Sequence, residues 1–407
     1  MEEFSIMLID KVRELVTNKE NEMIEFRRDL HKNPELSMQE FETSKKIAKE
    51  LEKMGIKCRL ANPTGVIAEI EGAKKGKTVL LRADIDALPI KEENEIEYKS
   101  INEDISHACG HDTHAAMLLN AAYALNELKS EFNGTVRLLF QPGEETGEGS
   151  VAMVRDGAID GVDNAFGAHI FTIFKTGEIG ATTGQTFAAN NFVTLTFKGL
   201  TTHGSTPQKG VDALIMAASF IMNAQNIISR EIDLLEEPVV LTFGKINGGE
   251  VANSVCGEVK IEGGFRAFTT ESVKFVIDRI KTMANDIAKM YGGEVEIETK
   301  QGAAPVFIDE NSGKLMQKVA AEIVGEENVK TEVRFSGSED FGLYLEGFEG
   351  RKGVPGAYAI VGAKSDDDER THKFNHASDF FIDESAMKNG AMMYALYAIE
   401  YLNQDEF

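Results

Sequence analysis

The chain has 407 residues, of which 43 are Lys or Arg and 67 are Asp or Glu, giving a formal net charge of −24 at neutral pH. A negative field of this size repels phosphate backbones and anionic lipid surfaces, so we expect neither nucleic acid nor a membrane as a partner. Hydrophobic residues make up 42% of the chain, as in globular proteins, and no apolar run approaches the ~18 residues of a membrane-spanning helix.

The cysteines are few and spread along the chain, at Cys58, Cys109 and Cys256. This is not the pattern of a disulfide-stabilised secreted domain. The stretch 1–15 is charged and amphipathic, which is typical of a first helix and not of a signal peptide. These features together predict a cytoplasmic protein.

The first part of the chain alternates between helical and extended patterns. Apolar residues recur at helical spacing in some stretches, whereas short runs rich in Val, Ile and Leu indicate strands in others. In chain order we predict helices at 4–16, 20–31 and 38–55, strands at 57–61, 65–72 and 78–86, a helix at 113–128, a strand at 135–142, a short helix at 151–157 and a strand at 164–170. This alternation is typical of an α/β fold with a mostly parallel sheet and helices on both faces.

The pattern changes near residue 185 and changes back near residue 302. Between them we predict a strand at 192–198, a helix at 210–228, strands at 238–246 and 258–267, a helix at 269–292 and a strand at 294–300. This β-α-β-β-α-β order is that of a ferredoxin-like α+β unit. Helices at 311–325 and 384–403 and a strand at 357–363 follow. We therefore predict one catalytic domain in two pieces, 1–184 and 302–407, with a smaller domain, 185–301, inserted between them.

The stretch SHACGHDTHAA combines a thiol with several imidazoles: Cys109, His111 and His114 lie within six residues of one another. Thiolate and neutral imidazole are both good ligands for zinc-like metals. We expect extended backbone here, on which residues two apart share a face, and Gly110 would let the chain approach an ion closely. From these residues alone, a buried Cys beside a structural His is an equally good interpretation.

Further polar clusters follow the predicted strands: Asp84 and Asp86 in DID, Glu144 and Glu145 in GEE, and His169 in GAH. Ligand sites in open α/β sheets gather at the carboxyl ends of strands, so we expect these clusters to meet the Cys-His stretch at one edge. Adjacent side chains on extended backbone point to opposite sides. We therefore expect one glutamate to ligate an ion and the other to face a bound water as general base.

Seven motifs occur in the order and spacing of a known family: RADIDALP, SHACGHDTH, QPGEETGEG, GAH, THGSTPQKGVDA, GSEDF and HASDFFIDE. On these motifs the chain resembles the zinc-dependent amidohydrolases, which include hippurate hydrolases, N-acyl-amino-acid deacylases, auxin-conjugate hydrolases and acetyl-diaminopimelate deacetylases. That family belongs to the wider aminoacylase and carboxypeptidase superfamily. The resemblance extends from DLHKNPELS at residue 29 to Glu384.

The resemblance implies a site for two divalent metal ions. Carried over by position, the ligands would be Cys109, His111, Glu145, His169 and His376. Cys109 would bridge the ions, and Zn would suit these ligands best, with Mn, Co or Ni as alternatives. Two cations lower the pKa of a shared water towards roughly 7. Glu144 takes the family's general-base position, so it would remove a proton from this water and pass it to the leaving amine.

The family's lid motif falls in the inserted domain. The resemblance implies that His203 in THGSTP donates a hydrogen bond to the oxyanion, in this family often at the site of a neighbouring subunit. We therefore expect a homodimer or a larger homo-oligomer formed through this domain. For the carboxylate of an anionic substrate, we interpret Arg266 in GGFRAF as the positive site, helped by Asn253.

The chain departs from the family pattern at several places. Gln208 and Ser378 stand where family members commonly have His and Pro, and an acidic insert, 364–375, precedes His376. These departures concern substrate preference more than the chemistry, because the inferred ligands are all present.

The expected reaction is hydrolysis of the amide bond that joins an acetyl or aromatic acyl group to an amino acid. The alternative within the same chemistry is a dipeptidase or carboxypeptidase acting on short peptides. A different class, a cysteine-nucleophile amidase, would use Cys109 with a neighbouring histidine but would leave the other predicted ligands without a purpose. A non-catalytic metal-binding module would not need Glu144.

Overall fold

The computed structural model describes residues 2–404, which form two compact units. The first unit contains the residues up to 184, together with 308–334 and those from 340 onward. The second contains 185–307 and 335–339. Within residues 2–404, no helix has the length and apolarity needed to cross a bilayer.

The first unit is built around an eight-stranded sheet with the order β1-β2-β4-β3-β5-β16-β6-β13. Its strands are β1 (Cys58–Leu60), β2 (Val66–Glu71), β3 (Thr78–Asp84), β4 (Thr135–Gln141), β5 (Asn164–Lys175), β6 (Ile179–Gly180), β13 (Val329–Lys330) and β16 (Gly356–Lys364). The four central strands β4, β3, β5 and β16 run parallel, whereas β1 and β2 form an antiparallel edge. The predicted α/β class with a mostly parallel sheet is confirmed.

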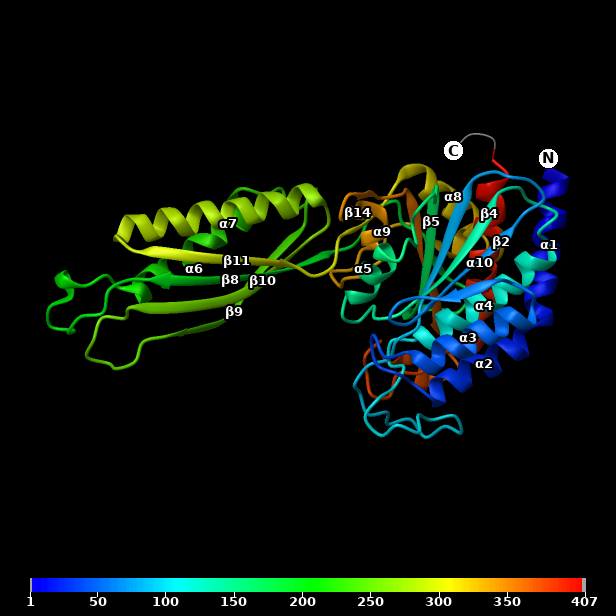
Figure 1. Cartoon of the computed structure of the whole chain (residues 1–407), viewed down its shortest axis with the longest axis horizontal. Coiled ribbons are helices and arrows are strands. Elements are labelled where there is room, and N and C mark those ends of the chain that lie inside the picture. The colour runs from blue at the N-terminus through cyan, green and yellow to red at the C-terminus, as the bar shows by residue number, and fades with distance from the viewer. Residues whose placement is uncertain (1, 405–407) are drawn as a thin grey trace. The chain divides into compact units, whose positions relative to one another are not determined.

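Helices cover both faces of this sheet (Figure 1). They are α1 (Glu2–Asn18), α2 (Glu20–Lys32), α3 (Phe41–Lys53), α4 (His111–Glu127), α5 (Glu148–Arg155), α8 (Glu310–Val324), α9 (Gly342–Glu346) and α10 (Met387–Leu402). Phe166 of β5 stacks on Tyr397 of α10 with ring centroids 4.3 Å apart. The next residue, Gly167, faces Phe341 at the start of α9. Because neighbouring residues of a strand point to opposite faces, α10 and α9 lie on opposite sides of the sheet.

Helix α4 is almost entirely buried, because it packs on β3 and β5 and is itself covered by α2 and α10. This burial agrees with its apolar sequence, which lacks the polar face of a surface helix. The carboxyl ends of β3 and β5 and the first turn of α4 are thereby brought to the same part of the unit.

The second unit is a four-stranded antiparallel sheet in the order β11-β8-β10-β9. In chain order its elements are β8 (Ala189–Lys198), α6 (Ala213–Arg230), β9 (Val239–Gly248), β10 (Glu258–Ala267), α7 (Thr270–Tyr291) and β11 (Glu294–Gln301). This is the predicted β-α-β-β-α-β order. Alternate residues of β8 and β10, among them Leu195, Phe197 and Ile261, form one core with the apolar faces of α6 and α7, so both helices lie on the same face of the sheet (Figure 1).

The second unit also includes two stretches outside the 185–301 segment, 302–307 and 335–339. Phe335 explains the second stretch, since its backbone N–H donates to the Thr186 carbonyl at 2.8 Å and its ring stacks on Phe187. No prediction was made for the shortest strands: β6, β7 (Gly184–Phe187), β12 (Val306–Ile308), β13, β14 (Gly347–Phe348) and β15 (Arg351–Lys352). Elements of two to four residues are too short to show a hydrophobic period.

Candidate metal centre

The predicted clusters meet where three parallel strands end. Asp84 is the last residue of β3, and the QPGEE turn follows β4 directly. β5 runs on to Lys175, but its pairing with β3 stops at Gly167. His169 therefore lies two residues past this pairing, level with the last residue of β3, as the rule for open α/β sheets anticipates.

Cys109 and His111 come from the loop that leads into α4. Gly110 is the N-cap in the left-handed conformation, with φ +91°, and a Cβ on it would lie 2.7 Å from the Ile170 side chain. Only glycine fits this backbone without strain. Our expectation of extended backbone here was wrong, because Cys109 lies in a tight turn and His111 opens the helix.

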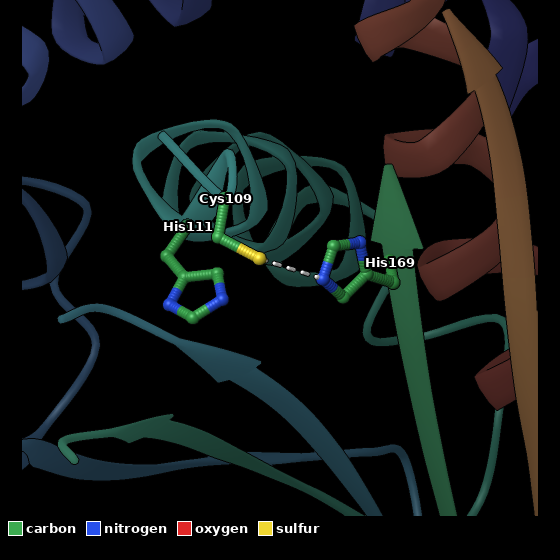
Figure 2. A group of neighbouring side chains, drawn as sticks. All are labelled: Cys109, His111 and His169. Atoms are coloured by element: carbon green, nitrogen blue, oxygen red, sulfur yellow. Dashed lines mark hydrogen bonds between the residues drawn. The ribbon is translucent and has the colours of Figure 1, made fainter. Parts of the chain in front are cut away.

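Cys109, His111 and His169 nevertheless converge: one potential ligand atom from each lies within 4.8 Å of the other two. Figure 2 shows the thiol of Cys109 pointing at the ring of His169, which projects from β5. The distance from Cys109 Sγ to His169 Nε2 is 3.4 Å. All three side chains are buried.

A second group forms around the same sulfur. His376 Nε2 lies 3.3 Å from Cys109 Sγ and 3.3 Å from Glu145 Oε1. Cys109, Glu145 and His376 again place their ligand atoms within 4.8 Å of one another. The thiol thus belongs to two groups at once, and this is the arrangement in which a thiolate can bridge two ions.

The loop that carries His376 is held by its neighbour Asn375. The Asn375 side-chain amide donates to the carbonyls of Cys109 at 2.9 Å and Ile170 at 3.1 Å, and the His376 backbone N–H donates to Ala108 at 2.7 Å. His376 itself has φ +72°, which few non-glycine residues adopt without such support. Sequence reasoning did not single out Asn375, since a lone Asn in a loop carries no periodic signal.

Hydrogen bonds fix the orientation of two imidazoles. His111 Nδ1 donates to Asp86 Oδ1 at 3.0 Å, and His169 Nδ1 donates to the Ile170 carbonyl at 2.8 Å. In each ring Nδ1 is engaged by these bonds and Nε2 faces the cluster, so Nε2 is the nitrogen that could ligate a metal. His111 Nε2 and Glu145 Oε1 are buried without a hydrogen-bond partner among residues 2–404. Buried polar atoms normally have partners, so these two atoms fit a bound cation.

His114 lies in the same cluster, but it has no free nitrogen. Its Nδ1 donates to Asp84 Oδ1 at 2.5 Å, and its Nε2 accepts the backbone N–H of Ile170 at 2.8 Å. Because Ile170 follows His169 in β5, this bond ties the strand that carries His169 to α4. His114 is therefore a supporting residue and not a ligand.

Glu144 and Glu145 lie in a turn after β4, so our expectation of extended backbone was wrong here as well. The turn brings both carboxylates to the same ring: Glu144 Oε2 lies 4.0 Å and Glu145 Oε1 3.9 Å from His111 Nε2. Glu145 Oε1 also lies 3.3 Å from His376 Nε2. The Glu145 carboxylate is therefore shared between the ring of His111 and the ring of His376.

Burial dominates the electrostatics of the cluster. It raises the pKa of the Cys109 thiol well above its usual range and lowers the pKa of the His169 imidazole well below its own. Burial is also the largest influence on His111 and opposes its charge, but Asp84, Cys109 and the hydrogen bond to Asp86 together outweigh it and raise the pKa of that imidazole. A thiol with a raised pKa is not an activated nucleophile, whereas coordination to a cation deprotonates a thiol outright.

The predicted oxyanion donor, His203, is an exposed residue of the second unit. Its Nδ1 accepts the backbone N–H of Ser205 at 3.1 Å, so the ring proton sits on Nε2 and is available for donation. The Gly204 backbone N–H donates to the Asn253 carbonyl at 2.7 Å. His203 and Asn253 thus lie on two loops that are bonded to each other.

Arg266 lies at the opposite end of the same sheet. It is the ninth of the ten residues of β10 and bonds the Ser338 hydroxyl, whereas Asn253 comes five residues before that strand starts. The strand alone separates the two ends by roughly 25 Å. Within one chain Asn253 and Arg266 thus lie at opposite ends of β10, and the expectation that Asn253 helps Arg266 stays a prediction.

Comparisons with known proteins agree with these motifs. Residues 80–400 match the model of peptidase family M20/M25/M40. Thermostable carboxypeptidase 2 of Saccharolobus solfataricus is 33% identical over 401 residues, covering 98% of this chain and 100% of that protein. N-acetyl-L-cysteine deacetylase of Bacillus subtilis is 37% identical over 369 residues, covering 90% of this chain and 85% of that one.

A solved structure agrees as well. The crystal structure of a dinuclear metal-binding peptidase of the M20 family from Bacillus subtilis has 30% sequence identity and a TM-score of 0.81, covering 95% of this chain and 99% of that one. The family resemblance inferred from the motifs is confirmed. The chain belongs to peptidase family M20/M25/M40.

Proposed function

We propose that the protein is a metal-dependent amidohydrolase that cleaves the amide bond of N-acyl amino acids at a site for two divalent ions. The observation that carries this proposal is the position of Cys109 Sγ, which belongs to one group with His111 and His169 and to a second with Glu145 and His376. The deacetylase and the dinuclear peptidase to which the chain is similar support the proposal.

The donor set suits the proposed ions. One thiolate, three imidazoles and one carboxylate favour Zn²⁺ and also accept Mn²⁺, Co²⁺ or Ni²⁺. When bound, such ions supply Lewis acidity towards a carbonyl oxygen and acidify water. The protein contributes the orientation of the ligands, through the hydrogen bonds of His111 and His169 described above, and a buried setting for the charge.

Glu144 is the proposed general base. Its carboxylate lies 4.0 Å from His111 Nε2, beside the group that contains His111, where it could accept a proton from the attacking water and deliver that proton to the leaving amine nitrogen. His203, protonated on Nε2, is the proposed hydrogen-bond donor to the oxyanion. Arg266 is the proposed partner of the substrate carboxylate, because its guanidinium offers a bidentate fork.

We further propose a homodimer or larger homo-oligomer formed through the second unit. The separation of Arg266 from the pair His203 and Asn253 along β10 supports it, because a small substrate that touches both ends needs them from different copies. The cytoplasmic location and the absence of nucleic-acid and membrane partners stay predictions from composition.

A carboxypeptidase or dipeptidase is the second candidate function, favoured by the similarity to thermostable carboxypeptidase 2 along nearly the whole chain. Both functions need a positive site for the carboxylate of the substrate. They differ in the group on the other side of the scissile bond, which is an acyl group in an N-acyl amino acid and an amino acid with a free amine in a dipeptide.

A substrate panel tests the proposal. Purified protein loaded with Zn²⁺, Mn²⁺ or Co²⁺ would be assayed on N-acetyl and N-benzoyl amino acids, on dipeptides and on N-blocked dipeptides. We expect N-acyl amino acids to give the highest kcat/KM, with activity lost in EDTA and restored by metal. Preference for peptides would favour the second candidate, and activity that survives chelation would contradict a metal mechanism.

A further inference from the structure

The loop between α2 and α3, residues 33–40, has no role in the proposed reaction, although its first part, 33–37, belongs to the DLHKNPELS part of the family signature. In the structure this α2–α3 loop runs beside the segment that follows β3. The Ala87 backbone N–H donates to the Glu35 carbonyl at 2.9 Å, and Leu36 forms a bridge with Ala87. The loop is thereby fixed next to the turns that carry the proposed ligands.

Ser37 reaches the metal centre through one buried carboxylate. Its hydroxyl donates to Asp86 Oδ2 at 2.7 Å. The other oxygen of Asp86 accepts His111 Nδ1 at 3.0 Å, and Oδ2 also accepts the Glu145 backbone N–H at 3.1 Å. Ser37 therefore completes the set of bonds that holds Asp86 between two proposed ligands.

Glu40 supports the neighbouring turn. Its side chain is fully buried, and Oε1 accepts the backbone N–H groups of Met38 at 2.9 Å and Gly143 at 2.8 Å. Oε2 accepts the hydroxyl of Thr64 at 2.7 Å. Gly143 immediately precedes the proposed base Glu144, so the carboxylate of Glu40 fixes the start of the turn that aims it.

We propose that Ser37 and Glu40 are positioning residues for the hydrolytic site: Ser37 sets the His111 ring through Asp86, and Glu40 sets the Glu144–Glu145 turn through Gly143. The inference rests on the proposed function. Neither residue touches the reacting atoms. Loss of a group that orients a metal ligand typically costs 10–100-fold in metal affinity or activity, and a misplacement of about 1 Å costs on the order of 10²-fold in rate.

Ser37→Ala tests the first part, with Ser37→Thr as the variant that keeps the hydroxyl. Ser312→Ala is the matched control, because Ser312 is buried in α8 and bonds Asn164 at the opposite end of β5. Metal affinity would be measured by titrating metal-free protein with Zn²⁺ against a chelating dye. The environment of the thiol would be followed by thiolate-to-Co²⁺ charge-transfer absorption.

We expect Ser37→Ala to weaken Zn²⁺ affinity 10–100-fold, to change the Co²⁺ spectrum and to lower kcat with little change in KM. Ser37→Thr should recover most of the loss, whereas Ser312→Ala should lower the unfolding midpoint and leave Zn²⁺ affinity within twofold. Equal affinities in Ser37→Ala and Ser312→Ala would overturn the role of Ser37.

The second part uses Glu40→Ala against Glu40→Gln. The amide of Gln keeps an acceptor for the Gly143 N–H and a donor for Thr64, so we expect near-normal kcat, while Glu40→Ala should lower kcat 10–100-fold. Similar kcat for the two variants would overturn the role of Glu40, as would an Ala variant that stays unfolded when metal is added. If the wild type hydrolyses no N-acyl amino acid, the proposed function fails. Zn²⁺ affinity and the Co²⁺ spectrum, measured without substrate for the Ser37 and Glu40 variants alike, still decide the positioning role.

Discussion

Two polar clusters lie side by side in the first unit, and they differ in how completely their atoms are paired. Arg82 donates to Asp84 Oδ2 at 2.6 Å, to Asp340 Oδ1 at 2.6 Å and to the side chain of Gln141 at 2.8 Å. In the metal centre, by contrast, buried atoms of His111 and Glu145 have no hydrogen-bond partner within residues 2–404.

The two clusters show how a buried residue that supports its neighbours differs from a buried residue that could ligate a metal. Both clusters contain carboxylates and cationic groups, so residue type alone does not distinguish them. A carboxylate whose oxygens are satisfied by protein groups, as in Asp84, supports its neighbours. Buried atoms that lack a partner and also converge with other ligand atoms, as in His111 and Glu145, fit a bound cation.

The largest expected effect separates a ligand from the base. Cys109→Ala removes the atom common to both ligand groups, so we expect loss of bound metal and of activity together. Glu144→Gln leaves all five proposed ligands, so it should retain metal and lose activity by about 10²–10⁴-fold, the usual contribution of a general base. Elemental analysis beside a hydrolysis assay measures both quantities. Equal metal loss in the two variants would mean that the roles are misassigned.

The cluster around Arg82 should contribute to the free energy of unfolding and not to the affinity for metal. Arg82→Met leaves the buried carboxylates of Asp84 and Asp340 without their cation, and breaking a buried pair in this way costs about 3–5 kcal/mol. Denaturant unfolding of the metal-free protein measures the change. Arg155→Met is the control, since both side chains of its pair with Glu349 are exposed and such a pair should contribute little to stability. Equal losses of unfolding free energy in the two variants would show that the cluster around Arg82 contributes no more to stability than an exposed ion pair does.

His114 offers a finer test, because it lies among the ligands but has both nitrogens bonded within the protein. We expect His114→Gln to bind metal 10–100-fold more weakly while keeping the full number of ions, whereas His111→Gln should bind fewer ions. Titration of the metal-free variants with Zn²⁺ gives both stoichiometry and affinity. A stoichiometry reduced in His114→Gln would place this residue among the ligands.

The smallest expected effect concerns pH. Burial raises the pKa of Glu40 to about 6 from an ordinary value of 4.5. The folded state therefore holds this proton more tightly than the unfolded state, so the associated stability is present below about pH 4.5 and is lost as the pH rises through 6. The shift corresponds to about 2 kcal/mol.

Glu40→Gln cannot titrate, so it provides the comparison. Between pH 4.5 and 7 the metal-free wild type should lose about 2 kcal/mol more unfolding free energy than this variant. Denaturant titrations of both proteins at the two pH values measure the difference. Parallel pH dependences would show that Glu40 ionises freely in the folded protein.

The sequence predicted the long elements and the place of the site well, for physical reasons. Helices such as α7 carry a sustained apolar period, and polar residues after β3 and β4 had to meet at one sheet edge because parallel strands end there. The backbone of the ligand loops was predicted wrongly, since the left-handed Gly110 and the turn at Glu144 depend on tertiary contacts.

Single supporting residues were beyond sequence reasoning. Asn375, Ser37 and Glu40 act through one or two hydrogen bonds each, and an isolated polar residue in a loop or at the start of a helix carries no pattern. The distance between Arg266 and Asn253 was also missed, because two motifs close in sequence lie far apart when a full strand runs between them.

The central claim is that two ions flank the sulfur of Cys109. Crystals of the metal-loaded protein, measured on both sides of the zinc absorption edge, test this directly. We predict two anomalous peaks, each about 2.3 Å from Cys109 Sγ, one beside His111 and His169 and the other beside Glu145 and His376. A single peak, or peaks that do not contact the sulfur, would contradict the claim.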